Sequence, residues 1–272
     1  MTAGSDSRRR PLLALGLVLA VVVLGSAVTA RADEDKVDPD RPDVSNSTRT
    51  VPRATFQLET GFEHARESVG GKPVQRRSTF QADLRAGVTD RLEVRLETEP
   101  LVHLRDDQND TGVGDVTVGL KYRFRDSREG EWWPSLGVQP FVKLPVAKSP
   151  IGSRRPDFGA RALASFELPA SFGLDLNAGL VAVGQSRPSG YLLQALASAS
   201  LSREFTEKFS TFVELFFGSR EARDGRHTLG LDAGLIYLLS RRVALDAGVE
   251  TSLNGQGPDI AFRAGLTVRL GR

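Results

Sequence analysis

Apolar and polar residues alternate along almost the whole chain after residue 54, and this period of two constrains the fold more than any other feature. In the segment RLEVRLETE, residues 91–99, Leu92, Val94 and Leu96 occupy one phase and charged residues fill the other. Successive side chains of a β-strand point to opposite faces, so the pattern predicts strands with one aliphatic and one ionic face. Twelve segments follow it: residues 56–63, 80–88, 91–99, 116–124, 135–144, 157–168, 173–183, 191–202, 209–217, 228–238, 243–252 and 260–270.

The segments are about nine to twelve residues long, which is enough for a tilted strand to cross a bilayer. A soluble sandwich or a lipocalin-like barrel shows the same alternation, so the connections have to decide between the classes. Short connections at 89–91, 167–173 and 239–242 alternate with long ones at 66–77, 105–115 and 147–157. Outer-membrane barrels place short turns in the periplasm and longer loops outside, and the pattern favours that class.

Aromatic and glycine positions support the same interpretation. Aromatic residues of the aliphatic phase gather near strand ends, as amphipathic rings do at headgroup depth. Phe56, Phe124, Phe166, Phe209 and Tyr237 fall at the short-turn end, with Trp132 and Trp133 in a connection there, and Phe62, Phe158, Tyr191, Phe217 and Phe262 fall at the long-loop end. The polar phase contains Gly61, Gly87, Gly119, Gly137, Gly159, Gly179, Gly234, Gly248 and Gly265, which ease curvature and leave room inside a barrel.

The predicted fold is therefore all-β, a closed transmembrane up-and-down barrel of about 12 antiparallel strands with a polar lumen. Leu92, Val94 and Leu96 are expected to face lipid, and Arg95 and Glu97 to face the lumen. Twelve strands lie between the eight that side chains can fill and the roughly 16 that hold an open aqueous channel. The expected pore is narrow, either open or closed in part by the acidic segment before Ala54.

The first residues are expected to direct export. Arginines at 8–10, an aliphatic run at 12–24 and small residues at Ala30 and Ala32 form a secretory signal with cleavage after Ala32, by the Sec or the Tat route. The alternative is an uncleaved inner-membrane anchor, because residues 12–29 approach the roughly 18 apolar residues that span a bilayer. The expected organisation is a signal peptide at 1–32, an acidic periplasmic segment at 33–53 and the barrel at 54–272.

Composition excludes several function classes. The absence of cysteine removes disulfides, thiol nucleophiles and cysteine-ligated metals, and there are only 3 histidines. The chain has 36 basic and 34 acidic residues; the signal holds four of the former and one of the latter, which leaves a net charge of about −1 and gives no reason to expect nucleic-acid binding. No hydrolase, metalloprotease or phosphate-loop motif occurs. The remaining enzyme hypothesis, a lipase-like pair of Ser135 and His103, places the two residues at opposite ends of the barrel.

The loop RDDQNDTGVGD, residues 105–115, raises the question of a calcium site, since hard cations prefer clustered carboxylates. The glycine and the final glutamate of a calcium-binding loop are missing, and a solvated external loop is favoured. Weak bridging of lipopolysaccharide phosphates through a divalent cation is the most that this loop supports. No metal site and no cofactor are therefore expected.

Charged residues of the polar phase are the candidate functional residues. Counting strands to their midpoints places Arg85, Arg95, Lys121 and Arg161 on one wall, and Glu214, Asp232 and Asp246 at a similar depth on the other. Opposite signs on opposite walls would create a transverse field that orients dipolar solutes. Local pairing, such as Arg95 with Asp83 or Glu97, is the alternative for the basic wall; the acidic trio has no base at that depth on neighbouring strands. The lumen-lining candidates are Glu59, Arg85, Arg95, Glu97, Lys121, Arg161, Glu214, Asp232, Asp246 and Arg263.

Five pieces of sequence, in order, resemble a known family: DRPDVSNSTRTVPRATFQLETGF, LRAGVTDRLEVRLE, GVGDVTVGLKYRF, PSLGVQPFVKLP and FVELFF. Together they look like the outer-membrane transporter family named after the meta pathway of phenol degradation, from about Asp40 to the C-terminus. The resemblance implies a barrel channel for small, often aromatic, molecules. One departure is the end VRLGR, because outer-membrane barrels often end on an aromatic residue.

The predicted function is passive passage of small molecules, aromatic compounds among them, across the outer membrane of a Gram-negative-type envelope. The alternative is a non-conducting structural or adhesion-type barrel, and the short loops with few aromatic residues favour the channel. Expected partners are outer-membrane lipid and lipopolysaccharide, small-molecule solutes and the barrel-assembly machinery.

Overall fold

The computed structural model describes residues 36–69, 72–128 and 132–271, and almost all of their regular structure is antiparallel strand. The expected signal peptide and its cleavage site lie outside these residues. The elements are β1 Thr55–Val69, β2 Lys72–Thr89, β3 Leu92–Arg105, β4 Asn109–Gly112, β5 Val116–Arg125, β6 Ser135–Leu144, β7 Asp157–Leu168, the short 3-10 helix η1 Pro169–Ser171, β8 Phe172–Ser186, β9 Ser189–Thr206, β10 Phe209–Gly218, β11 Thr228–Ser240, β12 Val243–Ser252 and β13 Ile260–Gly271. None of the helical structure in these ranges is long and apolar enough to cross a membrane.

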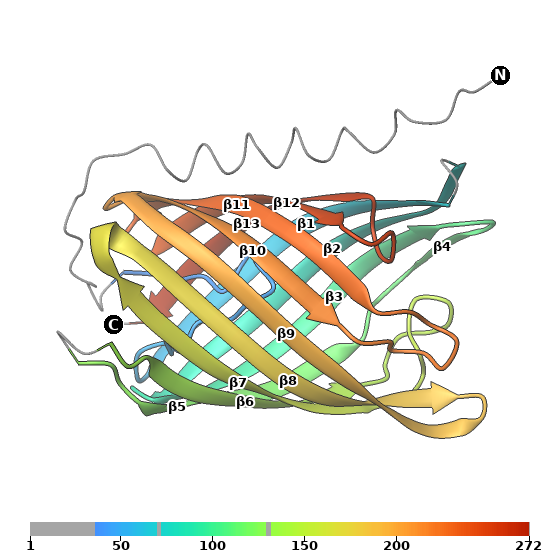
Figure 1. Cartoon of the computed structure of the whole chain (residues 1–272), viewed down its shortest axis with the longest axis horizontal. Helices are drawn as coiled ribbons and strands as arrows, with labels where there is room; N and C mark the ends of the chain where they lie inside the picture. Colours follow the sequence, from blue (N-terminus) through green and yellow to red (C-terminus); the bar gives the residue numbers. More distant parts are fainter. Residues whose placement is uncertain (1–35, 70–71, 129–131, 272) are drawn as a thin grey trace.

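Twelve of the strands close into a barrel (Figure 1), which confirms the predicted fold class. Neighbours in sequence pair in antiparallel order, and β1 closes the cylinder by pairing with β13 from Thr55 to Arg66. The short strand β4 pairs with β3 and extends that wall beyond the barrel at the long-loop end. The pairing of β1 with β13 leaves no unpaired edge strand in the membrane-spanning part of the described sheet, which is the condition for a sheet to stand in lipid.

The connections differ in length between the two ends of the barrel, with exceptions to the predicted alternation. Tight turns join β2 to β3, β7 to β8, β9 to β10 and β11 to β12, while longer connections lie mainly at the other end. Two connections depart from this pattern: residues 126–134 between β5 and β6 form a longer connection at the short-turn end, and only two residues separate β8 from β9 at the long-loop end. The region 66–77 is not a long loop, because β1 continues to Val69 and β2 begins at Lys72. These strand ends carry polar residues in both phases, so the alternation that identifies the membrane-spanning part does not extend to them.

The barrel exposes apolar side chains and encloses polar ones. Val94 and Leu96 are 37% and 41% exposed, and Phe62 and Phe262 near the long-loop end are 51% and 55% exposed. The largest fully buried side chains include Arg85, Lys121, Gln57, Gln139 and Glu59. This inversion of the usual arrangement is typical of a barrel whose outer band faces lipid and whose interior is polar.

Candidate functional site

Residues 36–53, the lumenal segment, lie inside the barrel rather than in the periplasm (Figure 1). Their backbone and side chains bind groups on strands from both walls, so the segment crosses the lumen. Between residues 36 and 53 the backbone is not paired with a strand in a β-ladder. Several of its backbone groups are instead hydrogen-bonded by the inward-facing polar side chains of the barrel. The site is therefore the polar lumen together with the segment that occupies it.

Asp40 anchors the segment to one wall. Its carboxylate accepts hydrogen bonds from Arg95 on β3, at 2.5 Å, and from Lys121 on β5, at 2.6 Å, and lies 3.3 Å from Arg85 on β2. Burial alone would raise the pKa of the Asp40 carboxyl, but the three cations outweigh burial and hold the pKa well below its usual range. Asp40 is therefore an anion seated among three buried cations.

Glutamates on β1 and β3 complete this ionic cluster. Glu59 accepts hydrogen bonds from the backbone nitrogen of Asp40, at 3.1 Å, and from Arg85, at 2.8 Å. Glu93 accepts two bonds from Arg85, both at 3.0 Å, and a third from the backbone nitrogen of Val51, at 2.7 Å. The cations and carboxylates of this wall neutralise one another. This agrees with the local-pairing alternative for the basic residues, and the lumenal segment supplies an additional partner, Asp40.

The segment reaches the opposite wall between residues 44 and 48. Glu214 on β10 accepts hydrogen bonds from the backbone nitrogen of Val44, at 2.7 Å, and the hydroxyl of Ser45, at 2.5 Å. Asn177 on β8 exchanges two bonds with the backbone of Asn46, at 2.8 and 2.9 Å. These bonds from strand side chains fix the segment across the middle of the barrel.

The interpretation that the acidic trio lacks basic partners is wrong for two of its members, Asp232 and Asp246. Asp232 lies 2.5 Å from Arg263 of β13, which also binds Glu250 on the intervening strand β12. Asp246 lies 3.7 Å from Arg41 of the lumenal segment. The long guanidinium side chain of Arg263 reaches across one strand, and Arg41 comes from a segment that a count of strand positions does not include.

The structure places the predicted lumen-lining residues on the inside of the barrel, where many of them contact the lumenal segment. Glu59, Arg85, Arg95, Lys121, Glu214, Asp232 and Asp246 are all buried. Glu97 is more open, with 38% of its side chain exposed, and lies 3.4 Å from Arg95. Arg161 stacks over the ring of Phe141, at 5.1 Å, and lines two of the cavities. They face a lumen whose centre is crossed by the lumenal segment.

Two glycines of the inner face make room for the segment. A side chain at Gly61 would meet the guanidinium of Arg41, 2.0 Å from the position of its first carbon. A side chain at Gly87 would meet the backbone oxygen of Pro52 at 2.1 Å. The backbone at Pro52 cannot move as a side chain can, so Gly87 is required where the segment enters the barrel.

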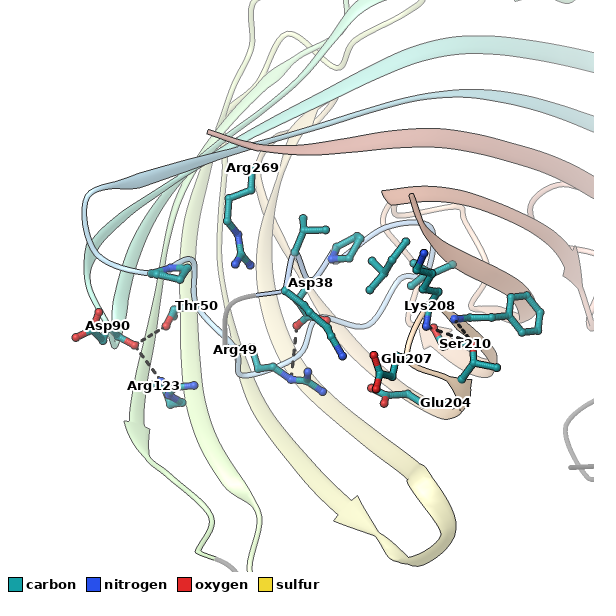
Figure 2. A pocket seen from close by; sticks show the side chains of 18 residues that line it. Asp38, Arg49, Thr50, Asp90, Arg123, Glu204, Glu207, Lys208, Ser210 and Arg269 are labelled. Carbon is teal, nitrogen blue, oxygen red and sulfur yellow. Dashed lines mark hydrogen bonds and ion pairs between the residues drawn. The ribbon is translucent and has the colours of Figure 1, made fainter. Parts of the chain in front are cut away.

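Cavities remain on both sides of the segment. Figure 2 shows the one at the short-turn end, about 290 Å³. There the side chains of Thr50 and Arg123 donate hydrogen bonds to the backbone oxygen of Asp90, and Arg49 forms an ion pair with Asp38 at 3.5 Å. A second cavity of about 450 Å³ lies toward the long-loop end and is lined by Asp40, Asp83, Lys143 and other charged residues. A third, of about 210 Å³, adjoins Val44 on the β7–β11 side. The segment is thus a partition between two polar vestibules.

Three inward-facing phenylalanines were not assigned from the sequence. Phe212 and Phe216 share the phase of Glu214 on β10, and Phe141 shares the phase of Gln139 on β6. Each ring lies over a glycine of the next strand; the ring of Phe216, for example, would be 2.1 Å from a side chain at Gly230. The available signal was an aromatic residue in the charged phase of a strand, opposite a glycine.

The enzyme and metal hypotheses gain no support from the geometry. His103 lies on β3 near the long-loop end and is 2.8 Å from the hydroxyl of Thr111, whereas Ser135 begins β6 at the other end and accepts a bond from the backbone nitrogen of Ser127. In the loop at 105–115, Asp106 caps a turn through the backbone nitrogen of Gln108. Within the described ranges, no group of three or more histidine, cysteine or acidic residues is arranged to hold a metal ion.

Comparisons with known proteins agree with the architecture. Residues 39–270 match the family described as "Putative MetA-pathway of phenol degradation". An outer membrane channel from Pseudomonas putida F1 has a TM-score of 0.63 at 16% identity, covering 86% of this chain and 100% of its own. The NanC porin, at 10% identity, and the KdgM porin in complex with disordered oligogalacturonate, at 8%, both have TM-scores of 0.54 and cover 79% of this chain and 100% and 99% of theirs. Among curated proteins the chain has no match.

Proposed function

The chain belongs to this phenol-degradation family, as its sequence resemblance predicted, and from that premise we propose that it is an outer-membrane channel for the passive passage of small molecules, aromatic compounds among them. The observation that carries the proposal is the pair of vestibules, about 290 and 450 Å³, on opposite sides of the lumenal segment. A barrel with a purely mechanical role has no need of polar cavities opening toward both ends. The segment would set the aperture between them.

A route along the β7–β11 side is supported by the residues that line it. The charged groups of the β1–β5 wall are engaged with the segment, whereas the cavity beside Val44 is lined by Gly179, Gly218, Leu196 and Phe216. Ligand sites combine apolar surfaces with a few polar groups, and this wall offers glycine-widened space beside an aromatic ring. The chemistry suits solutes that have a flat apolar face and a polar edge, which is the basis for including aromatic compounds.

One feature favours the alternative of a non-conducting barrel. The segment is bound to both walls through Asp40 and Glu214, so in this conformation it obstructs the centre of the lumen. Conduction therefore requires solutes to pass beside the segment or the segment to leave its seat. Its buried polar contacts exchange for water when it does so, which keeps the net free energy of seating far below the sum of its bonds.

The expected location and partners follow from the fold. The apolar outer band supports a location in the outer membrane, and in the usual arrangement of such barrels the short turns would lie in the periplasm and the long loops outside. Export would use the signal peptide ending at Ala32, insertion would use the barrel-assembly machinery, and the outer leaflet would bring lipopolysaccharide against the barrel.

Swelling of proteoliposomes tests the proposal. Liposomes that contain the purified mature protein are diluted into isosmotic arabinose, phenylalanine or a trisaccharide, and the fall in light scattering gives the rate of solute entry. We expect entry of the first two at rates above those of protein-free liposomes, and exclusion of the trisaccharide by the narrow lumen. Rates equal to those of protein-free liposomes for every solute would support the non-conducting barrel.

A further inference from the structure

Three arginines form a row on the outer face of the barrel near its long-loop end. Arg66 of β1 lies opposite Arg76 of β2, and Arg76 lies opposite Arg105 of β3. All three side chains are exposed. Directly opposed residues on adjacent strands are about 5 Å apart at Cα, so the three guanidinium groups share one small patch.

The position of this arginine row relative to the membrane follows from the strand register. Two residues nearer the middle of the membrane lie His64, Ser78 and His103, and two residues further in lie Phe62, Phe80 and Leu101. Four residues of strand span about 13 Å, or about 10 Å of depth for a strand tilted near 40°. Phe62 and Leu101 are 51% and 53% exposed and belong to the apolar outer face. The arginine row therefore lies just above that band, at the level of polar headgroups.

The row has no internal counter-charge. Among the described residues, no carboxylate forms an ion pair with Arg66, Arg76 or Arg105. The one side-chain bond within the patch runs from Arg66 to His64, at 3.3 Å, and His64 is in turn 2.8 Å from the hydroxyl of Ser78. Like charges directly opposed on adjacent strands are destabilising, so a bound external anion would stabilise the row.

We propose that the arginine row binds phosphate groups of the outer-leaflet glycolipid, lipopolysaccharide. Guanidinium groups bind phosphate through paired hydrogen bonds, and three of them side by side match a headgroup that carries more than one phosphate. The apolar row of Phe62, Phe80 and Leu101 below provides the surface for acyl chains of the same molecule. Charge above and apolar surface below select a lipid over a soluble anion.

Lipid A is the probe for this proposal. The purified full-length mature protein in a neutral detergent is titrated with lipid A, and bound lipid is measured by native mass spectrometry. The triple substitution Arg66→Gln, Arg76→Gln and Arg105→Gln should weaken binding roughly 100-fold, since each cation near an anionic surface contributes a factor of about five. Dephosphorylated lipid A should bind the wild type as weakly as lipid A binds the triple variant.

A matched control separates the row from general surface charge. Arg220, Arg223 and Arg226 are equally exposed but lie in the connection between β10 and β11. Their triple change to glutamine should leave lipid A binding within about twofold of wild type. Each variant is first checked for a folded barrel by its altered migration when unboiled. If the triple glutamine variant of the row does not fold, the single substitution Arg76→Gln takes its place, with an expected loss of about fivefold.

Three outcomes would overturn the proposal. One is unchanged lipid A binding after the substitution of the row. Another is an equal loss in the Arg220, Arg223 and Arg226 control, which would mean diffuse attraction. The third is competition by inorganic phosphate at millimolar concentration with no preference for the lipid, which would mean a soluble-anion site. None of these readouts depends on whether the lumen conducts.

Discussion

Asp40 of the lumenal segment and Lys121 of β5 form a buried ion pair inside the barrel, with 2.6 Å between the carboxylate oxygen and the ammonium nitrogen. The pair joins a part of the chain that precedes the first strand to a wall 81 residues further along. The same carboxylate lies against Arg85 and Arg95. The bound position of the segment inside the lumen, its seat, therefore depends strongly on the Asp40 side chain. Substitution of Asp40 can test the proposed channel.

Substitution of Asp40→Asn should weaken the seat of the segment. It removes the anion from a group of three buried cations, and loss of one partner from a buried pair destabilises by on the order of 3 kcal/mol. In planar bilayers we expect the Asp40→Asn variant to spend more time in a conducting state than the wild type. Asp38→Asn is the matched control, because Asp38 faces Arg49 at 3.5 Å in a partly exposed pair. Equal behaviour of the two variants would contradict the role given to Asp40.

The seat should also weaken as pH rises, because of Asp43. Its enclosure in the barrel, together with the charges of Glu214, Asp175, Asp40 and Asp232, raises the pKa of Asp43 well above its usual range. The segment therefore binds this proton more tightly in its lumenal position than when it is released. The contribution of Asp43 to the stability of the lumenal position is complete below about pH 4 and is lost as pH rises through the raised pKa. Asp40 acts in the opposite sense: its contribution is present above about pH 4 and declines only in acid.

The measurement is open probability between pH 5 and pH 9. We expect it to rise with pH in the wild type, and the Asp43→Asn variant, which cannot ionise, to lose most of this dependence. An unchanged pH profile in Asp43→Asn would show that other groups control the response.

The lipid-facing assignment is tested by charge at two depths. Leu96 lies near the middle of the apolar outer stretch of β3, which runs from Leu92 to Leu101, and is 41% exposed, whereas Val88 lies near the short-turn end of β2 and is 48% exposed. Leu96→Arg should destabilise the barrel by about 2–4 kcal/mol and Val88→Arg by about 0–1 kcal/mol, since the penalty depends on depth in the bilayer. Urea-driven unfolding from liposomes, followed by the mobility of the unboiled protein in SDS, measures both. Similar losses at the two positions would argue against a membrane-spanning β3.

The acidic trio should influence selectivity mainly when the segment is absent. In the seated state Asp232 and Asp246 are paired with Arg263 and Arg41, and Glu214 is bound to the segment backbone. Changing the three to Gln, Asn and Asn should therefore shift the reversal potential toward anions in a barrel lacking residues 36–51, and much less in the full-length protein. The shift should fade near 1 M salt, where the screening length is about 3 Å. An equal shift in both backgrounds would mean that the trio faces the conducting path even with the segment in place.

The barrel is predictable from the sequence because its cause is local. Each strand must place apolar residues outward at every second position, as Leu92, Val94 and Leu96 do. This pattern can be recognised within a short stretch of sequence. The phase of Glu59 or Arg85 follows from the same rule, and both lie inside. Strand length is less well predicted, since β1 and β2 continue beyond the membrane with polar residues in both phases.

The occupied lumen could not be predicted with the same assurance because its contacts are long-range. The lumenal segment has no hydrophobic period, and the sequence left an outward and an inward position open. The bond from Asn46 to Asn177 joins residues 131 positions apart, and nothing near either one indicates the other. The error over Asp232 has a related origin, because Arg263 reaches it across a strand while a count of depth compares only adjacent positions.

Single-channel conductance of the mature protein with and without residues 36–51 is the most direct test of the proposed channel. We expect small, intermittent conductance for the full-length protein in a planar bilayer, and a larger, steadier conductance for the deletion variant, whose unboiled migration checks that the barrel has folded. A folded deletion variant and a full-length protein that both fail to conduct at any salt concentration would contradict a channel and identify a non-conducting barrel.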